Sequence, residues 1–146
     1  FNQGFMTSEL CAASILDMKW HELTEEDLAK LSEGDQAANV AEFEKKVAVD
    51  VTIDEIIPRY RTTYFNHIIN SGYSAGYYSY LWAEVLDKDA FEYFQQQGIY
   101  NPEVALKFRQ TFLEKGGSEE PMTLYLSFRG AQPDPGALLR ARGLTE

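Results

Sequence analysis

Helix start and stop signals constrain this chain most, because they divide it into short helical segments. Asn101-Pro102 combines a capping side chain with a proline at the first helical position, and Gly116-Gly117 stands about one helix length further on. This spacing predicts a helix over residues 102–115. No segment alternates apolar and polar residues as a half-buried strand does. The sequence therefore predicts an all-α fold.

Similar signals, together with apolar spacing, predict the other helices. They lie at about 7–21, 25–32, 36–49, 77–86, 89–97, 121–128 and 135–142. The first begins at the capping residue Thr7 and carries apolar residues almost all round, which predicts deep burial. Pro58 biases the residue before it away from helical backbone, so residues 59–69 are predicted either as a short helix or as an extended stretch.

Six of the nine tyrosines lie between Tyr60 and Tyr80, together with one histidine and two glycines. Tyrosine joins an apolar ring to a hydroxyl that needs a partner or water, so this density indicates a binding surface rather than a core. Gly72 and Gly76 allow sharp turns or close approach of the backbone to a ligand. The segment is therefore predicted to be a tyrosine-lined loop that enters a helix.

The charge of the chain argues against one class of partner. Its net charge is −10, and residues 1–57 carry 13 acidic and 4 basic side chains. Phosphate backbones bind clustered Lys and Arg, so nucleic acid is not an expected partner. No apolar run reaches the roughly 20 residues of a membrane helix, and no leader resembles a signal peptide. A cytoplasmic location is expected, with export left open because the chain begins at Phe1 without Met.

Motifs for metal binding and for nucleophilic catalysis are missing from the sequence. The two histidines, His21 and His67, are far apart, and neither belongs to a His-Glu-x-x-His motif. Catalytic zinc usually takes three protein ligands, so no metal site is expected within this chain. The single cysteine, Cys11, lies in an apolar helical pattern, which predicts a buried thiol. Carboxylate pairs such as Glu25 and Glu26 stand where helices begin, and we interpret them as helix-dipole or solvated charges.

Several separated motifs, in the same order, resemble a known enzyme family. They are residues 1–5, 16–21, 59–68, 72–82 and 128–130. Together they closely resemble the C-terminal part of peptidyl-dipeptidases in the thimet-oligopeptidase family of zinc peptidases. The run at 59–61 and the ending at 142–144 are more similar to the dipeptidyl-carboxypeptidase branch than to the endo-oligopeptidase branch.

The resemblance implies a mostly helical, two-lobed peptidase whose deep channel admits short unstructured peptides. Residues 1–146 would form the C-terminal part of its catalytic domain. The zinc-binding helix lies upstream in such enzymes, so the implied cofactor is zinc in the full-length enzyme, with its ligands outside this chain. The implied partners are short peptide substrates and the upstream remainder of the same domain. The isolated chain is expected to be inactive.

The resemblance also implies catalytic roles within the tyrosine segment. The family's histidine matches His67, and its active-site tyrosines match Tyr73 and Tyr80. Attack on a peptide carbonyl creates an oxyanion, and a phenol beside it donates a hydrogen bond that strengthens as charge develops. Tyr80 is the first candidate for this donor. Tyr73 is a second donor or a ligand of the substrate backbone, and His67 is expected to bond a peptide carbonyl near the scissile bond.

Substrate binding is assigned to Tyr77, which shapes the wall, and to Gly72 and Gly76, which allow the loop to close on the peptide. Family members often carry consecutive glycines before the first tyrosine, whereas Asn and Ser precede Gly72 here. Arg59 and Arg61 are expected to pair with neighbouring carboxylates rather than with the carboxylate of a substrate.

Two alternatives stay open at this point. An endo-oligopeptidase of the same family differs in product, because only a dipeptidyl carboxypeptidase needs the free C-terminal carboxylate of its substrate. A non-catalytic helical module would instead bind a partner peptide on its tyrosine surface. An upstream His-Glu-x-x-His, followed by a further glutamate on the next helix, would separate the enzyme from the module.

Overall fold

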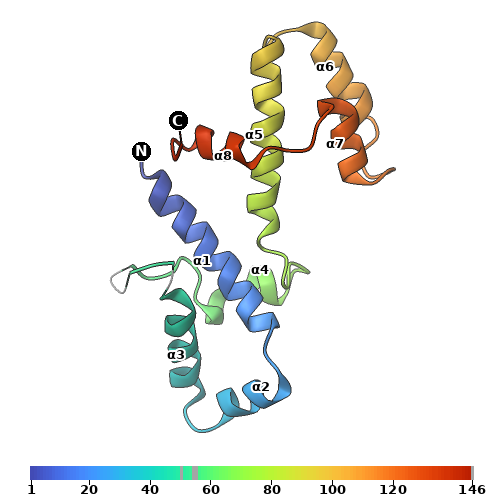
Figure 1. The fold of residues 1–146 in the computed structure, drawn as a ribbon. Coiled ribbons are helices and arrows are strands. Elements are labelled where there is room, and N and C mark those ends of the chain that lie inside the picture. The colour runs from blue at the N-terminus through green and yellow to red at the C-terminus, as the bar shows by residue number, and fades with distance from the viewer. Residues whose placement is uncertain (50, 54–55, 146) are drawn as a thin grey trace. The chain divides into compact units, whose positions relative to one another are not determined.

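The computed structural model describes residues 1–49, 51–53 and 56–145, and over these residues it contains helices and no strand (Figure 1). The predicted all-α class is confirmed. The chain divides into two compact units, Phe1–Leu81 and Trp82–Glu146, and the division falls within helix α5 (Ser79–Gln97). Among the described helices, none combines the length and the apolar character that crossing a membrane requires.

Unit 1 consists of three helices followed by two short helical turns. They are α1 (Gln3–His21), α2 (Glu25–Ser32), α3 (Gln36–Ala48), a 3-10 helix at Thr62–Tyr64 and α4 (Asn66–Ile69). The sequence left residues 59–69 open between helix and extended backbone. The structure has two helical turns there, separated by Phe65, which is fully buried.

The core of unit 1 lies where α1 meets the residues that precede the tyrosine loop, defined here as residues 70–78. Leu16 of α1 clusters with Phe65 and Ile68, and all three side chains are buried. Trp20 packs against this cluster and donates its indole N–H to Oγ1 of Thr62 over 2.8 Å. The start of the tyrosine loop is therefore anchored on α1.

Helix α1 differs from its prediction in two respects. It begins at Gln3, and Thr7 lies inside it, where the hydroxyl donates to the Gln3 carbonyl over 2.7 Å instead of capping the helix. Deep burial is also wrong for this chain. Phe5 and Met6 are exposed, and the buried residues form one stripe (Ala12, Ala13, Ser14, Leu16 and Asp17). An apolar sequence on all sides does not supply packing partners on all sides.

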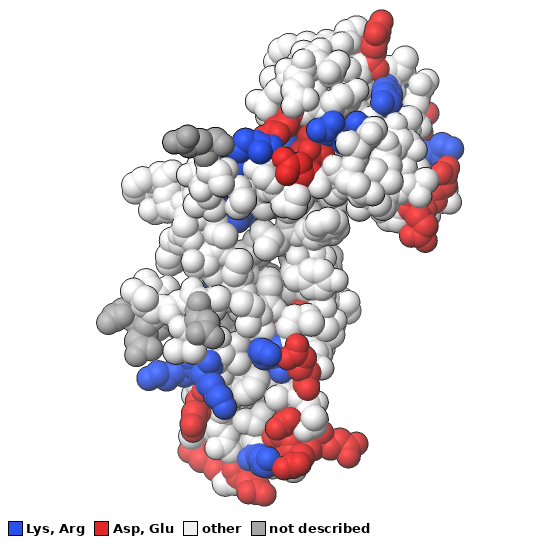
Figure 2. Space-filling model, viewed as in Figure 1, with Lys and Arg blue, Asp and Glu red and all other residues white. Residues whose placement is uncertain are grey.

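Helices α2 and α3 confirm their predicted starts. Thr24 accepts a hydrogen bond from the amide of Asp27, whose carboxylate accepts from the amide of Thr24, so a reciprocal capping box begins α2. Asp35 caps α3 through the amides of residues 37 and 38. The acidic first turn of α2 contributes to the cluster of acidic side chains seen at this end of unit 1 (Figure 2).

Helix α5 is one continuous helix, whereas the sequence predicted two, at 77–86 and 89–97. The prediction was wrong because Asp89 was interpreted as a helix start. Its carboxylate is 1% exposed and is bonded to the side chains of Tyr125 and Arg129, so it serves tertiary packing rather than a cap.

The rest of unit 2 follows the predicted helix signals. It contains α6 (Pro102–Phe108), a π-helical segment (Arg109–Leu113), α7 (Pro121–Arg129) and α8 (Pro135–Ala141). The helix predicted over 102–115 is present, but it changes from α-helical to π-helical after Phe108. There the amide of Glu114 donates to the carbonyl of Arg109, five residues earlier. Phe128 of α7 is fully buried and its ring contacts those of Phe94 and Phe108.

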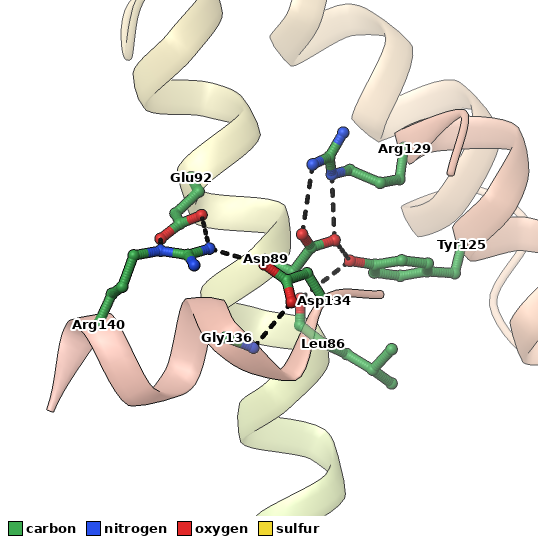
Figure 3. A network of polar contacts seen from close by, with 8 residues as sticks. All are labelled: Leu86, Asp89, Glu92, Tyr125, Arg129, Asp134, Gly136 and Arg140. Atoms are coloured by element: carbon green, nitrogen blue, oxygen red, sulfur yellow. Dashed lines mark hydrogen bonds and ion pairs between the residues drawn. The ribbon is translucent and has the colours of Figure 1, made fainter. Parts of the chain in front are cut away.

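A polar network fastens α5 to α7 and α8 within unit 2 (Figure 3). Arg129 Nε lies 3.0 Å from Asp89 Oδ2, and the hydroxyl of Tyr125 donates to the same carboxylate. Burial, and then the hydrogen bond to Asp89, raise the pKa of Tyr125. On the exposed side, Arg140 of α8 bonds both oxygens of Glu92 at 2.8 Å. Within unit 2, hydrogen bonds between side chains therefore fasten α5 to α7 and α8.

Candidate active site

The predicted catalytic residues come from three neighbouring segments of unit 1. His67 lies on α4, Tyr73 lies in the tyrosine loop, and Tyr80 is the second residue of α5. The structure brings them together, with Nε2 of His67 2.8 Å from the hydroxyl oxygen of Tyr80. The rings of Tyr73 and Tyr80 stack at 5.6 Å with an angle of 6°, and the ring of His67 lies 4.5 Å from that of Tyr73.

Tyr73 and Tyr80 present their phenols at the surface of unit 1. Each side chain is 39% exposed, whereas His67 is half-buried. Partial desolvation, and then the neighbouring hydroxyl of Tyr73, raise the pKa of Tyr80. A raised pKa keeps the Tyr80 phenol protonated, and therefore a donor, at neutral pH. The arrangement can therefore donate hydrogen bonds to an oxygen placed between them.

Tyr77 occupies a different position from the other two tyrosines. Its ring packs edge to face on Phe65 at 5.1 Å and on Tyr60 at 5.9 Å, in the core of unit 1. It also contacts Tyr80 at 5.2 Å. Burial, and then the hydrogen bond with Tyr60, raise the pKa of Tyr77 to about 12. Tyr77 thus joins the exposed phenols to the core of unit 1.

The two predicted loop glycines have different backbone requirements. Gly72 has φ 79°, in the left-handed region that favours glycine, and nothing lies within 4 Å of an added Cβ. The amide of Gly76 donates to the carbonyl of Tyr73 over 2.9 Å, and an added Cβ would lie 3.3 Å from that oxygen. The expected turn and entry into a helix are therefore present. Ala75 also has a positive φ, 53°, which the sequence did not predict.

The residues present do not fit a zinc site. Within the described part of the chain, no group of three or more His, Cys, Asp and Glu side chains is placed to hold a metal ion. Each imidazole has other partners. His21 Nδ1 lies 2.9 Å from Oδ1 of Asp17, and His67 is bonded to Tyr80.

Arg59 and Arg61 are engaged by carboxylates of the helices α1 and α3. Arg61 Nε lies 2.5 Å from Oε2 of the buried Glu44, whose other oxygen accepts from the amide of Thr62. Arg59 pairs with Glu9 at 3.4 Å. The predicted pairing with neighbouring carboxylates is confirmed.

Asp17 is a residue of this site that the sequence interpretation missed. It is fully buried on α1, and its carboxylate accepts the backbone amides of Ala75 and Tyr77. The available signal was a single acid in an otherwise apolar stretch, between Leu16 and Met18. A charge there requires buried donors, because a buried carboxylate without them is strongly unfavourable.

The chain is similar in sequence to several known proteins. The profile of peptidase family M3 matches residues 1–144. Dipeptidyl carboxypeptidase of Escherichia coli (strain K12) is 41% identical over 146 residues, which cover 99% of this chain and 20% of that protein. Oligopeptidase A of Haemophilus influenzae is 54% identical over 80 residues, which cover 55% of this chain and 12% of that protein. Probable cytosolic oligopeptidase A of Arabidopsis thaliana is 39% identical over 113 residues, which cover 74% of this chain and 16% of that protein. The chain spans about one fifth of the length of the dipeptidyl carboxypeptidase it matches.

Proposed function

Because the chain belongs to peptidase family M3, a family of zinc metallopeptidases, we propose that it forms the C-terminal part of the catalytic domain of a zinc-dependent peptidyl-dipeptidase. The proposed substrates are short peptides, from which the enzyme releases C-terminal dipeptides. The similarity to dipeptidyl carboxypeptidase over 99% of the chain supports this branch over oligopeptidase A of Haemophilus influenzae, whose similarity covers 55%.

The observation that carries the proposal is the convergence of two exposed phenols and one imidazole. His67, Tyr73 and Tyr80 are in mutual ring contact, and the contact between His67 and Tyr80 is a hydrogen bond of 2.8 Å. Two phenols that can donate hydrogen bonds, gathered with an imidazole beside a glycine-containing turn, suit the recognition of peptide oxygens.

The bond between His67 and Tyr80 leaves a donor for substrate in one tautomer of the imidazole. When the proton is on Nε2, His67 donates to the Tyr80 oxygen, and the Tyr80 O–H stays available. Attack on a peptide carbonyl places negative charge on its oxygen, and a fixed donor binds that charge more strongly than the neutral ground state. We assign this role to Tyr80, with Tyr73 as the second donor and Tyr77 as its support.

The zinc ligands are proposed to lie in the part of the enzyme outside this chain, since the described residues do not supply them. That remainder is also the proposed partner of this chain. We propose that substrate binds between it and the tyrosine loop. None of the roles given to His67, Tyr73 and Tyr80 requires them to bind the metal.

Paired peptides with free and amidated C-termini test the proposed reaction. The whole enzyme is expected to release a C-terminal dipeptide from the free peptide and to leave the amidated one intact, as mass spectrometry of the products would show. Internal cleavage of both peptides would favour the endo-oligopeptidase alternative. Cleavage of neither by the zinc-loaded enzyme would favour the non-catalytic peptide-binding module.

We also propose a cytoplasmic location for the whole enzyme, in line with the name of the Arabidopsis relative. Cell fractionation tests it, and recovery of the enzyme outside the cytoplasm would contradict it.

A further inference from the structure

Asp17 is fully buried on α1 and is bonded to the tyrosine loop, 58 and 60 positions away in the sequence. Its Oδ1 accepts the amide of Ala75 at 2.9 Å, and its Oδ2 accepts the amide of Tyr77 at 2.8 Å. His21 Nδ1 lies 2.9 Å from Oδ1, one helical turn further along α1. Both oxygens of one carboxylate are therefore used to hold the backbone of a single loop.

Packing alone does not account for a charge at this position. Burying a carboxylate is unfavourable unless hydrogen-bond donors satisfy it, and well-packed apolar replacements of buried charges are often neutral or stabilising. The neighbours of Asp17 in the α1 stripe, Ala13 and Leu16, belong to the apolar core. What the carboxylate adds to this core is a defined path for residues 75–77.

The loop residue that Asp17 binds has an unfavourable backbone conformation. Ala75 has φ 53°, in the left-handed region that L-residues with a β-carbon avoid. The bond from its amide to Asp17 and the bond from Gly76 N–H to the Tyr73 carbonyl hold the turn on both sides of this residue. Such conformations persist where surrounding contacts over-determine them, and they concentrate at functional sites.

We propose that Asp17 is a positioning residue that holds the tyrosine loop so that the phenols of Tyr73 and Tyr80 converge on His67. Tyr73 begins the turn that Asp17 secures, and Tyr77, whose amide Asp17 binds, contacts the Tyr80 ring at 5.2 Å. A shift of the backbone at 75–77 therefore moves both phenols. The effect on catalysis rests on the proposed function, whereas the effect on the loop rests on geometry alone.

Asp17→Asn in the whole enzyme tests this assignment. The asparagine side chain replaces one of the two acceptor oxygens by an NH2 group, which cannot accept from a backbone N–H of the loop. Exchange of the Ala75 and Tyr77 amides is expected to quicken about tenfold or more. The value of kcat is expected to fall roughly 10- to 100-fold with KM changed less than about threefold, as for misplaced catalytic groups. Ala75→Gly in the Asp17→Asn background should restore part of kcat, since glycine adopts a positive φ without strain.

Asp89→Asn is the matched control, because Asp89 is equally buried but binds side chains of unit 2. It is expected to leave both loop amides and kcat within about twofold of wild type. An Asp17→Asn enzyme with lower thermal stability but unchanged kcat and unchanged loop exchange would overturn the proposal.

Two further outcomes keep the test decisive. If Asp17→Asn does not fold, exchange in the wild-type enzyme decides: slow Ala75 and Tyr77 amides beside a fast Gly72 amide support the assignment, and equal rates overturn it. If the wild-type enzyme cleaves no peptide but Asp17→Asn still quickens loop exchange, the proposed function fails and the positioning of the loop by Asp17 stands.

Discussion

Each unit of this protein contains a buried aspartate on a long helix, and the two aspartates bind different kinds of partner. Asp17 of α1 accepts backbone amides of the tyrosine loop. Asp89 of α5 accepts the side chains of Tyr125 and Arg129, both on α7 (Figure 3). The exposed fractions, 0% and 1%, do not distinguish them.

The difference lies in what each carboxylate controls. A carboxylate bonded to side chains fastens one helix to another, so its loss is felt as lost stability. A carboxylate bonded to backbone amides sets the path of a loop, so its loss is felt by whatever that loop presents. The phenols of the two regions differ as well, because Tyr125, which is bonded to Asp89, is 3% exposed whereas Tyr80 is 39% exposed. We therefore expect substitutions in unit 2 to change stability and those in the loop region to change activity.

The largest expected effect on stability is that of Asp89→Ala. It leaves Arg129 and Tyr125 without their buried acceptor, which typically costs about 3–5 kcal/mol of unfolding free energy. Urea unfolding measures this loss, and kcat should stay within about twofold of wild type. Asp87→Ala is the control, because Asp87 is exposed on the same helix and should cost less than about 0.5 kcal/mol. A large fall in kcat for Asp89→Ala would break the division between the units.

Tyr80→Phe should show the opposite behaviour. It keeps the ring but deletes the hydroxyl, so kcat and kcat/KM are expected to fall together by about 100- to 1000-fold, or roughly 2.7–4 kcal/mol of barrier. Stability should change by less than about 1 kcal/mol, because the lost hydrogen bond to His67 is at the surface. Steady-state kinetics and thermal unfolding of the whole enzyme measure the two effects.

Tyr125→Phe is the matched control for Tyr80→Phe, since it deletes a buried hydroxyl of unit 2. It should cost about 1–3 kcal/mol of stability and leave kcat unchanged. If Tyr80→Phe instead lowered stability with kcat kept within about threefold, Tyr80 would be a structural hydrogen bonder and the donor role would move to Tyr73 or His67.

The sequence predicts those parts of the fold that depend on neighbouring residues. The capping box of Thr24 and the Asn101-Pro102 start are local, and both are present. The continuity of α5 was missed because Asp89 fits a helix start locally, whereas its actual partners lie 36 and 40 positions away. Local rules carry no information about such partners.

The sequence likewise identified some residues of the candidate site and missed others. Motifs in a fixed order identified His67, Tyr73 and Tyr80, and the structure brings these three together. Asp17 was not identified, because backbone amides are its partners and every residue type except proline has one. The positive φ of Ala75 also escaped prediction, since no glycine marks that position and the partner of its amide, Asp17, is distant in sequence.

The partly buried phenol of Tyr77 makes the stability of unit 1 depend on pH. The pKa of Tyr77 is about 12 in the folded protein, above the ordinary value of 10, because burial and Tyr60 favour the neutral phenol. Above pH 10 the phenol ionises more readily in the unfolded chain than in the folded protein. The free energy of unfolding is therefore expected to fall by about 1–2 kcal/mol as pH rises from 10 towards 12. Urea unfolding of wild type and Tyr77→Phe between pH 9 and 12 measures it. A constant difference between the two across this range would contradict the assignment.

The smallest effects compare two glycines with the same backbone. Gly72 in the tyrosine loop has φ 79°, Gly130 after α7 has φ 76°, and an added Cβ meets no atom within 4 Å at either position. Replacing each by alanine should cost about 1 kcal/mol of stability, because both force a β-carbon into the left-handed region. Only Gly72→Ala should also change kcat/KM, by a few-fold, since only Gly72 lies in the segment that presents Tyr73. Equal stability losses with a kinetic effect confined to Gly72 would separate backbone strain, which the two units share, from loop position, which they do not. A kinetic effect of the same size for Gly130→Ala would mean that strain in either unit reaches the residues that we propose to be catalytic.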